Sequence, residues 1–301
     1  MSMTQQVVFS AQRKDSLDCV ILQRPSFQNK SPYVADVRHN ETTHLAYVPS
    51  LSLSGKCVPG TFCLMNYAKD KKGNRIGPDC ISPKYGKKKC ELHSFLVLHK
   101  GTWIASHPKI GEKIATCLLN PGSIYEPISK SKIISCTPEV SHVAQTNMRV
   151  DFLLGHEDGS FTMVEVKTVV DSEEDLPASL KSLNMEEKGA IFPFGKKTQN
   201  FDGQKVVSER AIKHVSELTL VSKKLKKDAK YLVLNTCVLF IVVRGDCKFF
   251  RPHHKACPVF RQKLIDAQES GVLLIAHQFD WNVDDVKISC LDKGVIPVVL
   301  E

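Results

Sequence analysis

Three residues near the middle of the chain combine residue types and spacing that suit phosphate chemistry. Asp151 lies in the apolar segment 149–154, and Glu165 and Lys167 lie two positions apart in the segment 161–169. The polar turn between these segments predicts a β-hairpin. Side chains two apart on a strand point to the same face, so we expect the three side chains to converge.

This triad has the chemistry of a metal-dependent hydrolase. Asp151, Glu165 and the backbone carbonyl of Val166 offer the hard oxygen ligands that Mg²⁺ or Mn²⁺ binds. A cation held there polarises a phosphodiester and lowers the pKa of a bound water, and Lys167 can neutralise charge that develops on the phosphate. We therefore assign catalytic roles to Asp151, Glu165 and Lys167, in the D-x(n)-E-x-K arrangement of PD-(D/E)xK nucleases. A solvated Glu and Lys on an exposed strand is the competing interpretation.

The elements that must position the triad follow from periodicity and from start and stop signals. Apolar spacing predicts helices over 109–119 and 208–225, and a continuous apolar run predicts a buried strand over 238–243. A third helix over 257–270 and a strand over 272–277 complete a mixed α/β second half. Helix, hairpin, helix and buried strand follow one another in the order of a nuclease core.

Further charged residues on these elements are candidates for the same site. Glu112, in the first predicted helix, is a possible third metal ligand, and an ordinary surface charge is the alternative. For His214 the alternative is a partly buried histidine whose hydrogen bonds are satisfied. The basic residues that we expect to contact phosphates in this half are Arg149, Arg210, Lys213 and His214.

The segment from Cys19 to about Leu98 is different in character. Short apolar pieces alternate there with turn-rich segments, without helical periodicity, which predicts a small β-barrel of about five strands. Basic and aromatic side chains on such a barrel can bind nucleic acid, although a solvated surface with one core aromatic fits equally well. The candidates are Arg24, Lys30, Tyr33, Lys87, Lys88 and Lys89.

Composition limits the classes of protein. The chain has 301 residues, and 41 Lys and Arg against 32 Asp and Glu give a net charge of +9, which favours an anionic partner. Eleven cysteines without close pairs argue against a disulfide framework and for a cytoplasmic or nuclear protein with reduced thiols. No apolar run approaches the length of about 20 residues that crosses a bilayer, and no secretory signal is visible, so we expect a protein that is neither in a membrane nor secreted.

Eight ordered sequence blocks resemble the SfsA family, the sugar fermentation stimulation proteins, from about Ile21 to Leu291. They include N-M-R-V-D-F-L-L at 147–154, V-E-V-K-T-V at 164–169 and S-E-R-A-I-K-H-V-S-E-L at 208–218. The resemblance implies an OB-fold joined to a PD-(D/E)xK-type domain in a DNA-binding protein. The remaining blocks are Y-V-A-D-V at 33–37, P-G-T at 59–61, A-I-F-P at 190–193, L-F-I-V-V-R at 239–244 and F-R-P at 250–252.

These observations lead to an α+β fold in three parts. We expect a flexible extension over 1–19, an OB-fold nucleic-acid-binding barrel over 20–100 and a PD-(D/E)xK nuclease-like domain over 101–301, enlarged by insertions at 171–189 and 194–207. The predicted activity is Mg²⁺- or Mn²⁺-dependent hydrolysis of nucleic acid, DNA in preference to RNA. The alternative is a non-catalytic DNA-binding regulator with a vestigial nuclease site.

Overall fold

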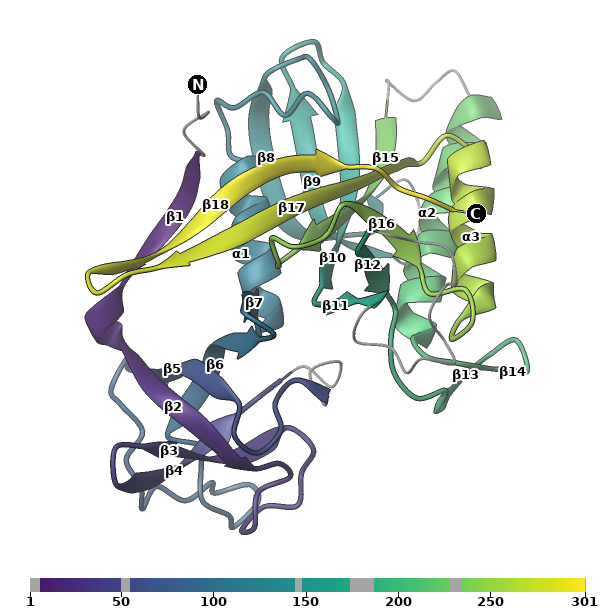
Figure 1. Ribbon diagram of the computed structural model, residues 1–301. Coiled ribbons are helices and arrows are strands. Elements are labelled where there is room, and N and C mark those ends of the chain that lie inside the picture. The colour runs from purple at the N-terminus through teal and green to yellow at the C-terminus, as the bar shows by residue number, and fades with distance from the viewer. Residues whose placement is uncertain (1–5, 50–54, 144–147, 174–186, 228–233, 301) are drawn as a thin grey trace. The chain divides into compact units, whose positions relative to one another are not determined.

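The computed structural model describes residues 6–49, 55–143, 148–173, 187–227 and 234–300 (Figure 1). The chain forms two compact units, which are described separately below. The first unit consists of Met1–Ile110, Val243–Asp246 and Phe279–Asp292, and the second consists of Gly111–Val242, Cys247–Gln278 and Lys293–Glu301.

The first unit contains the predicted barrel. Its five strands are β2 (Ser16–Gln23), β3 (Val34–His39), β4 (Thr42–Tyr47), β5 (Phe62–Tyr67) and β6 (Leu92–His99). They pair in the order β2-β3-β4-β6-β5, and β5 pairs with β2 to close the ring. All pairs are antiparallel except β4 with β6. Closure leaves no free edge among the five strands, as in an OB-fold.

The prediction of a flexible extension over 1–19 is wrong for residues 7–19, which form regular secondary structure. Strand β1 (Val7–Gln12) pairs antiparallel with β18 (Lys287–Ile296), and Val7 lies opposite Leu291 in this pairing. A short 3-10 turn, η1 (Arg13–Asp15), then leads directly into β2. Long-range pairing with the end of the chain orders this segment, and its polar composition did not reveal that partner.

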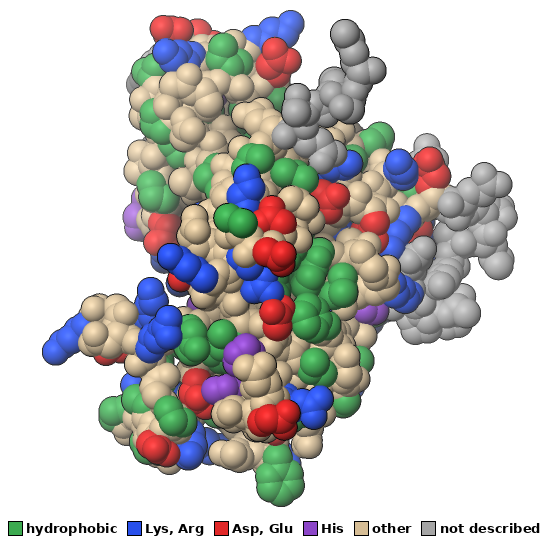
Figure 2. Space-filling model, turned by 60° about the vertical axis from the view of Figure 1, so that its left-hand side comes forward, with side chains coloured by type: hydrophobic (Ala, Val, Ile, Leu, Met, Phe, Trp, Pro, Cys, Tyr) green, Lys and Arg blue, Asp and Glu red, His purple; other side chains and the backbone are tan. Residues whose placement is uncertain are grey.

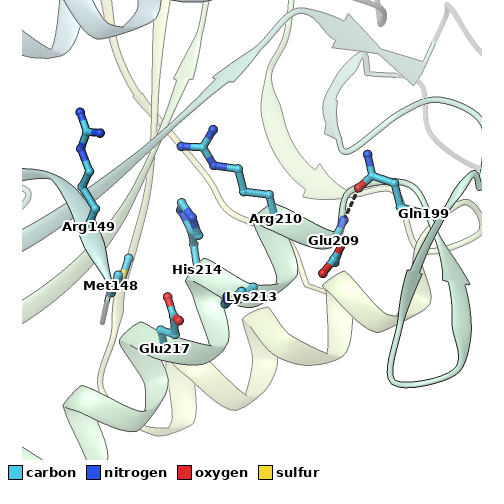
Figure 3. A pocket seen from close by; sticks show the side chains of 8 residues that line it. All are labelled: Met148, Arg149, Gln199, Glu209, Arg210, Lys213, His214 and Glu217. Atoms are coloured by element: carbon cyan, nitrogen blue, oxygen red, sulfur yellow. Dashed lines mark hydrogen bonds between the residues drawn. The ribbon is translucent and has the colours of Figure 1, made fainter. Parts of the chain in front are cut away.

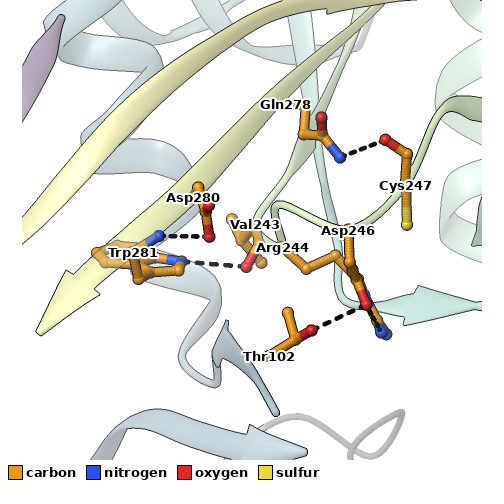
Figure 4. Close-up of polar contacts among 8 residues, drawn as sticks. All are labelled: Thr102, Val243, Arg244, Asp246, Cys247, Gln278, Asp280 and Trp281. Atoms are coloured by element: carbon orange, nitrogen blue, oxygen red, sulfur yellow. Dashed lines mark hydrogen bonds and ion pairs between the residues drawn. The ribbon is translucent and has the colours of Figure 1, made fainter. Parts of the chain in front are cut away.

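Two late segments complete the first unit, which therefore does not end at residue 100. Segment 243–246 contains Arg244, which is 0% exposed. Its guanidinium donates two hydrogen bonds to the carboxylate of Asp246, at 2.7 and 2.9 Å. Thr102 of β7 (Thr102–Ala105) donates a hydrogen bond to the same carboxylate (Figure 4). Trp281 donates its indole N–H to the carbonyl of Val243. The contact of Thr102 with Asp246 connects residues 144 positions apart in sequence, and that of Trp281 with Val243 connects residues 38 positions apart.

The second unit is built on a mixed sheet. Strands β8 (Ile133–Ser141), β9 (Arg149–His156) and β10 (Phe161–Val169) form an antiparallel meander, and β10 then pairs in parallel with β15 (Leu234–Val242). Strand β15 pairs in parallel with β17 (Leu273–Val283). The predicted hairpin of residues 149–169 is therefore present, and the predicted strands over 238–243 and 272–277 correspond to β15 and β17.

Helices cover this sheet. The helices α2 (Glu209–Lys227) and α3 (Pro258–Glu269) share a hydrophobic core with β10 and β15, including Ile212, Phe240 and Phe260. The first helix, α1 (Pro108–Leu118), approaches β10 closely, because a Cβ atom on Gly111 would collide with Thr168. The observed helices agree with the predicted ones to within two residues at each end.

Small sheets occupy the connections. Strands β11 (Asp171–Ser172), β12 (Gly189–Phe192) and β16 (Phe249–Pro252) form one, and β13 (Gln199–Phe201) with β14 (Gln204–Val206) forms a hairpin inside the expected insertion 194–207. Residues 174–186 of the other insertion lie outside the described residues. Among the described parts of the chain, no helix is both long and apolar enough to cross a membrane.

Candidate functional site

The hairpin brings the predicted triad together in the second unit. Strands β9 and β10 pair as far as Val164 opposite Phe152, and one further step of this antiparallel register places Asp151 opposite Glu165. Asp151 Oδ2 accepts the backbone N–H of Val166 at 2.7 Å. The register and this hydrogen bond hold Asp151 beside Glu165 and against the backbone of Val166, the residue before Lys167.

Glu165 is the centre of the cluster. Its side chain is almost completely buried, and its Oε1 atom accepts hydrogen bonds from Lys167 Nζ and from His214 Nδ1 on α2. Its other oxygen, Oε2, is buried and has no hydrogen-bond partner among the described residues. A buried carboxylate oxygen without a hydrogen bond has nothing to compensate for its lost hydration. This atom is therefore available to a cation or to a hydrogen-bond donor of a ligand.

The two carboxyl groups differ in their electrostatics. Burial raises the pKa of Asp151 above its usual value, and the neighbouring charge of Glu165 raises it further. Burial also opposes ionisation of Glu165, but the hydrogen bonds and positive charges of His214 and Lys167 outweigh it and hold the pKa of Glu165 below its usual value. The pKa of Asp151 is thus raised and that of Glu165 lowered, and a cation beside the pair would favour the ionised form of both carboxyl groups.

An open pocket of about 690 Å³ adjoins the cluster in the second unit. One wall is a stripe of α2 with side chains three, four and seven positions after Arg210, and Arg149 of β9 stands opposite (Figure 3). His214 lines this pocket and also bonds Glu165, so it connects the pocket to the carboxylates. The lining residues are Met148, Arg149, Gln199, Glu209, Arg210, Lys213, His214 and Glu217.

Four of the predicted phosphate contacts thus line one pocket, but they are not equivalent. Arg149 forms an ion pair with Glu139 on β8, whereas Arg210 and Lys213 are exposed on α2. His214 is largely enclosed and faces Glu165. The interpretation of His214 as a partly buried histidine with a satisfied hydrogen bond therefore describes its Nδ1 atom better than a phosphate contact does.

Glu112 does not join this cluster. It is exposed on α1, which packs at Gly111 against Thr168. Glu165 and Lys167 lie on the opposite face of β10 from Thr168, because neighbouring strand residues alternate between faces. This packing argues against the expectation of a third acidic ligand from α1. In the described part of the chain, no three or more His, Cys, Asp or Glu residues are grouped as a metal site.

The candidate residues of the barrel lie in the loop between β2 and β3 and in the loop between β5 and β6. The guanidinium of Arg24 donates to the carbonyls of Pro32 and Val48, so it holds the first loop together. The ammonium of Lys30 lies 5.1 Å from the ring centre of Phe27, whose side chain is 74% exposed. Such a pair presents a flat ring and a positive charge at one place.

The second loop repeats this combination. Lys84 lies over Tyr85 and Arg75 over Tyr67, in cation–π contacts of 5.1 and 3.8 Å. Figure 2 shows Lys and Arg side chains next to hydrophobic ones at several places on the visible face. The other predicted contacts are Tyr33, which is partly exposed, Lys87, which is exposed, Lys88, which pairs with Asp79 at 3.4 Å, and Lys89, which is half-buried.

The fold and site define a class before any comparison with known proteins. A closed five-stranded OB-type barrel is joined to an α/β unit of the restriction-endonuclease type, in an α+β protein. Asp151, Glu165 and Lys167 lie together on the β9–β10 hairpin of this unit.

Comparisons with known proteins then show which family the chain resembles. The model of the "Sugar fermentation stimulation protein RE domain" matches residues 180–285, a segment that contains α2 but not the hairpin. A sugar fermentation stimulation protein homolog of Desulforamulus reducens is 37% identical over 93 residues, and one of Clostridium tetani is 26% identical over 155 residues. These matches confirm the resemblance to the SfsA family that the sequence motifs indicate.

The extent of these matches differs. The two curated relatives are matched over 31% and 51% of this chain and over 34% and 51% of their own length. The solved structure of Pyrococcus furiosus SfsA in complex with Ca²⁺ aligns over 98% of this chain and 99% of that one, with a TM-score of 0.67 and 17% identity. The structural match shows that both units of the fold are shared.

Two features of the site were missed from the sequence. The bond between His214 and Glu165 joins residues 49 positions apart. The N–H of Glu209 donates to the side chain of Gln199, so the β13–β14 hairpin caps the first turn of α2 at the edge of the pocket. The helical stripe Arg210, Lys213, His214 was readable from the sequence, but the strand that it faces was not.

Proposed function

We propose that this chain is a divalent-metal-dependent nuclease that hydrolyses the phosphodiester bonds of nucleic acid. The observation that carries the proposal is the buried pair Asp151 and Glu165 beside Lys167, connected through His214 to a pocket with exposed cationic side chains. A simple surface ion pair does not explain why Oε2 of Glu165 is buried without a partner among the described residues. A polar contact in the core does not explain the adjacent basic pocket.

The residues present fit a hard divalent cation. Mg²⁺ is commonly held by only one or two carboxylates together with waters and substrate phosphates, so the absence of Glu112 from the cluster leaves a sufficient set. Glu165 Oε2 and the carboxylate of Asp151 would hold the ion. When bound, such an ion supplies Lewis-acid polarisation of the phosphate and a more acidic water.

The chain's own residues have distinct roles in this proposal. Lys167 neutralises charge that develops on the reacting phosphate, as a fixed positive group in a partly enclosed site does effectively. Arg210 and Lys213 contact the phosphates of the bound chain and set its position relative to the carboxylates. Burial opposes ionisation of Glu165, but the hydrogen bonds and positive charges of His214 and Lys167 lower its pKa and favour the carboxylate form, which binds a cation.

The choice of nucleic acid and of metal rests on further observations. The resemblance to the SfsA family favours DNA over RNA, and the exposed Phe27 with Lys30 on the barrel suits unstacked bases next to phosphates. The related Pyrococcus furiosus SfsA was solved in complex with Ca²⁺, a cation with the same preference for oxygen ligands as Mg²⁺ and Mn²⁺. We therefore propose Mg²⁺ or Mn²⁺ as the working ion.

A second candidate function is a non-catalytic DNA-binding protein with a vestigial site. One observation favours it: Lys167 is bound to Glu165 and thus turned toward the carboxylate that the metal would use. In that case the ion pair would be a permanent structural contact, and the basic surfaces alone would carry function.

Cleavage assays separate the two candidates. Purified protein is incubated with labelled single-stranded and duplex DNA and RNA in Mg²⁺, Mn²⁺ or EDTA. We expect cleavage that requires the metal and disappears in Asp151→Asn and Glu165→Gln. Glu112→Gln is the matched control, because it removes a carboxylate on the other face of β10 and should retain cleavage.

Loss of cleavage in the Glu112 variant would contradict the placement of the site. Binding of nucleic acid without cleavage in any of the three metal conditions would support the non-catalytic candidate instead.

A further inference from the structure

Both hydrogen-bond donors of the cluster act on one oxygen of Glu165. Lys167 Nζ and His214 Nδ1 meet at Oε1, and Oε2 has no partner in the described chain. Because a carboxylate only accepts hydrogen bonds, Nδ1 of His214 is the donor. The carboxylate is thus oriented by one residue of its own strand and one residue of a different element, α2.

In the proposed function Lys167 must reach the substrate as well as Glu165, and movement of its ammonium toward the phosphate weakens its contact with Oε1. Its role in the proposed function requires its ammonium beside the reacting phosphate, whereas the structure has it on Oε1. When Lys167 turns away, a carboxylate with 1% exposure would lose a charge-assisted hydrogen bond, and leaving a buried acceptor unpaired is costly. His214 is the side chain that remains on Oε1 in that state.

The support of His214 suits a positioning role. It projects from a helix of 19 residues whose neighbouring turns are anchored in the core by Ile212, Val215 and Leu218, all 0% exposed. A side chain on a rigid, well-packed element holds a partner more accurately than a side chain on a loop does. Its position is therefore independent of any movement of Lys167.

We propose that His214 is a positioning residue that holds Oε1 of Glu165, so that Oε2 stays directed at the divalent cation while Lys167 is released to the substrate. This inference rests on the proposed function, since it concerns the same metal site. It replaces the phosphate contact first expected of His214 with a role exerted through Glu165.

The rival interpretation makes the opposite prediction. If His214 is only a neighbouring group that contacts phosphate or adds positive charge, its removal leaves cation affinity unchanged or increases it. If it orients Glu165, its removal weakens cation binding, because groups that orient metal ligands typically contribute 10- to 100-fold in affinity. The sign of the change therefore decides between the two roles.

The experiment titrates Mn²⁺ into the full-length chain without nucleic acid, and free Mn²⁺ is measured by electron paramagnetic resonance. We expect His214→Ala to weaken Mn²⁺ binding about tenfold. His214→Asn, whose amide nitrogen occupies the same place along the side chain as Nδ1 and can still donate to Oε1, should bind within about threefold of the unsubstituted chain. Lys167→Ala removes a positive charge and keeps His214, so it should bind Mn²⁺ at least as tightly as the unsubstituted chain. Lys223→Ala, which removes a charge from the exposed side of α2, is the matched control.

Each outcome bears on the inference. Mn²⁺ binding by folded His214→Ala that equals or exceeds that of the unsubstituted chain would overturn the positioning role and leave the metal site intact. Absence of Mn²⁺ binding by the unsubstituted chain would overturn the proposed metal function, and the inference with it. If His214→Ala does not fold, His214→Leu takes its place, because its side chain fills similar space without a donor, and the comparison of Leu with Asn decides.

Discussion

Removal of the two exposed cations from the pocket should change the salt dependence of DNA binding by a calculable amount. Arg210 and Lys213 are exposed on one stripe of α2 and line the pocket, whereas Arg149 already pairs with Glu139. The double substitution Arg210→Gln and Lys213→Gln therefore removes two phosphate contacts and leaves the third cation in its ion pair.

The magnitude follows from counterion release. Each neutralised phosphate contributes about −0.9 to the slope of log K against log[salt] for duplex DNA and about −0.7 for single strands. Loss of two contacts should flatten the slope by about 1.8 or 1.4. Between 50 and 200 mM salt, the unsubstituted chain should then lose about 7- to 12-fold more affinity than the double variant does.

Fluorescence anisotropy of labelled DNA, with EDTA present to prevent cleavage, measures these slopes. A double variant of two exposed lysines away from the pocket, Lys223→Gln with Lys248→Gln, serves as the control and should keep the slope of the unsubstituted chain. Equal slopes for the pocket variant and the unsubstituted chain would refute the assignment of Arg210 and Lys213 as phosphate contacts. A chain whose affinity does not depend on salt at all would exclude nucleic acid as the partner.

Three further predictions concern catalysis and stability. Lys167→Ala should keep DNA affinity and lose most of kcat, because its charge acts on the transition state; equal losses in affinity and kcat, measured in steady-state assays, would contradict that role. The pKa of His253, which is 3% exposed, is lowered by burial from 6.5 to about 4, so the unfolded chain binds more protons between those pH values. The contribution of His253 to the free energy of unfolding should therefore fall by about 2 kcal/mol from pH 7.5 to pH 5, and His253→Asn should show a correspondingly smaller fall in urea titrations. Asp246→Ala takes the carboxylate from fully buried Arg244 and should lower the free energy of unfolding by about 3 kcal/mol, measured by urea denaturation; a change below 1 kcal/mol would show that the pair does not stabilise the fold.

The local elements were readable from the sequence because their signals are local. Apolar spacing and flanking Pro, Gly and Ser residues located α1, α2 and α3 to within two residues, and strand alternation across a polar turn located the β9–β10 hairpin. The convergence of Asp151 with Glu165 followed from the same signals, since a hairpin register is fixed by its turn and alternation. The closed barrel was predicted from the number and brevity of its strands.

The position of Glu112 could not be derived in this way. Its spacing in α1 suited a ligand, but the face of β10 that α1 covers is set by the contact of Gly111 with Thr168. That contact depends on packing between elements more than 50 residues apart. The pairing of β1 with β18 and the contacts of segment 243–246 with Thr102 depend equally on distant partners.

The sequence by itself determined the residue chemistry of this protein: two carboxylates and a lysine on a hairpin, a basic helical stripe and a family resemblance. Only the tertiary structure decided which groups share a hydrogen bond or an ion pair. It placed His214 on Glu165, left Oε2 of that carboxylate without a partner among the described residues and packed α1, which carries Glu112, against Thr168 on the other face of β10. The physical reason is that periodicity fixes the direction of a side chain relative to its own element, whereas its contacts depend on how elements distant in sequence pack against one another.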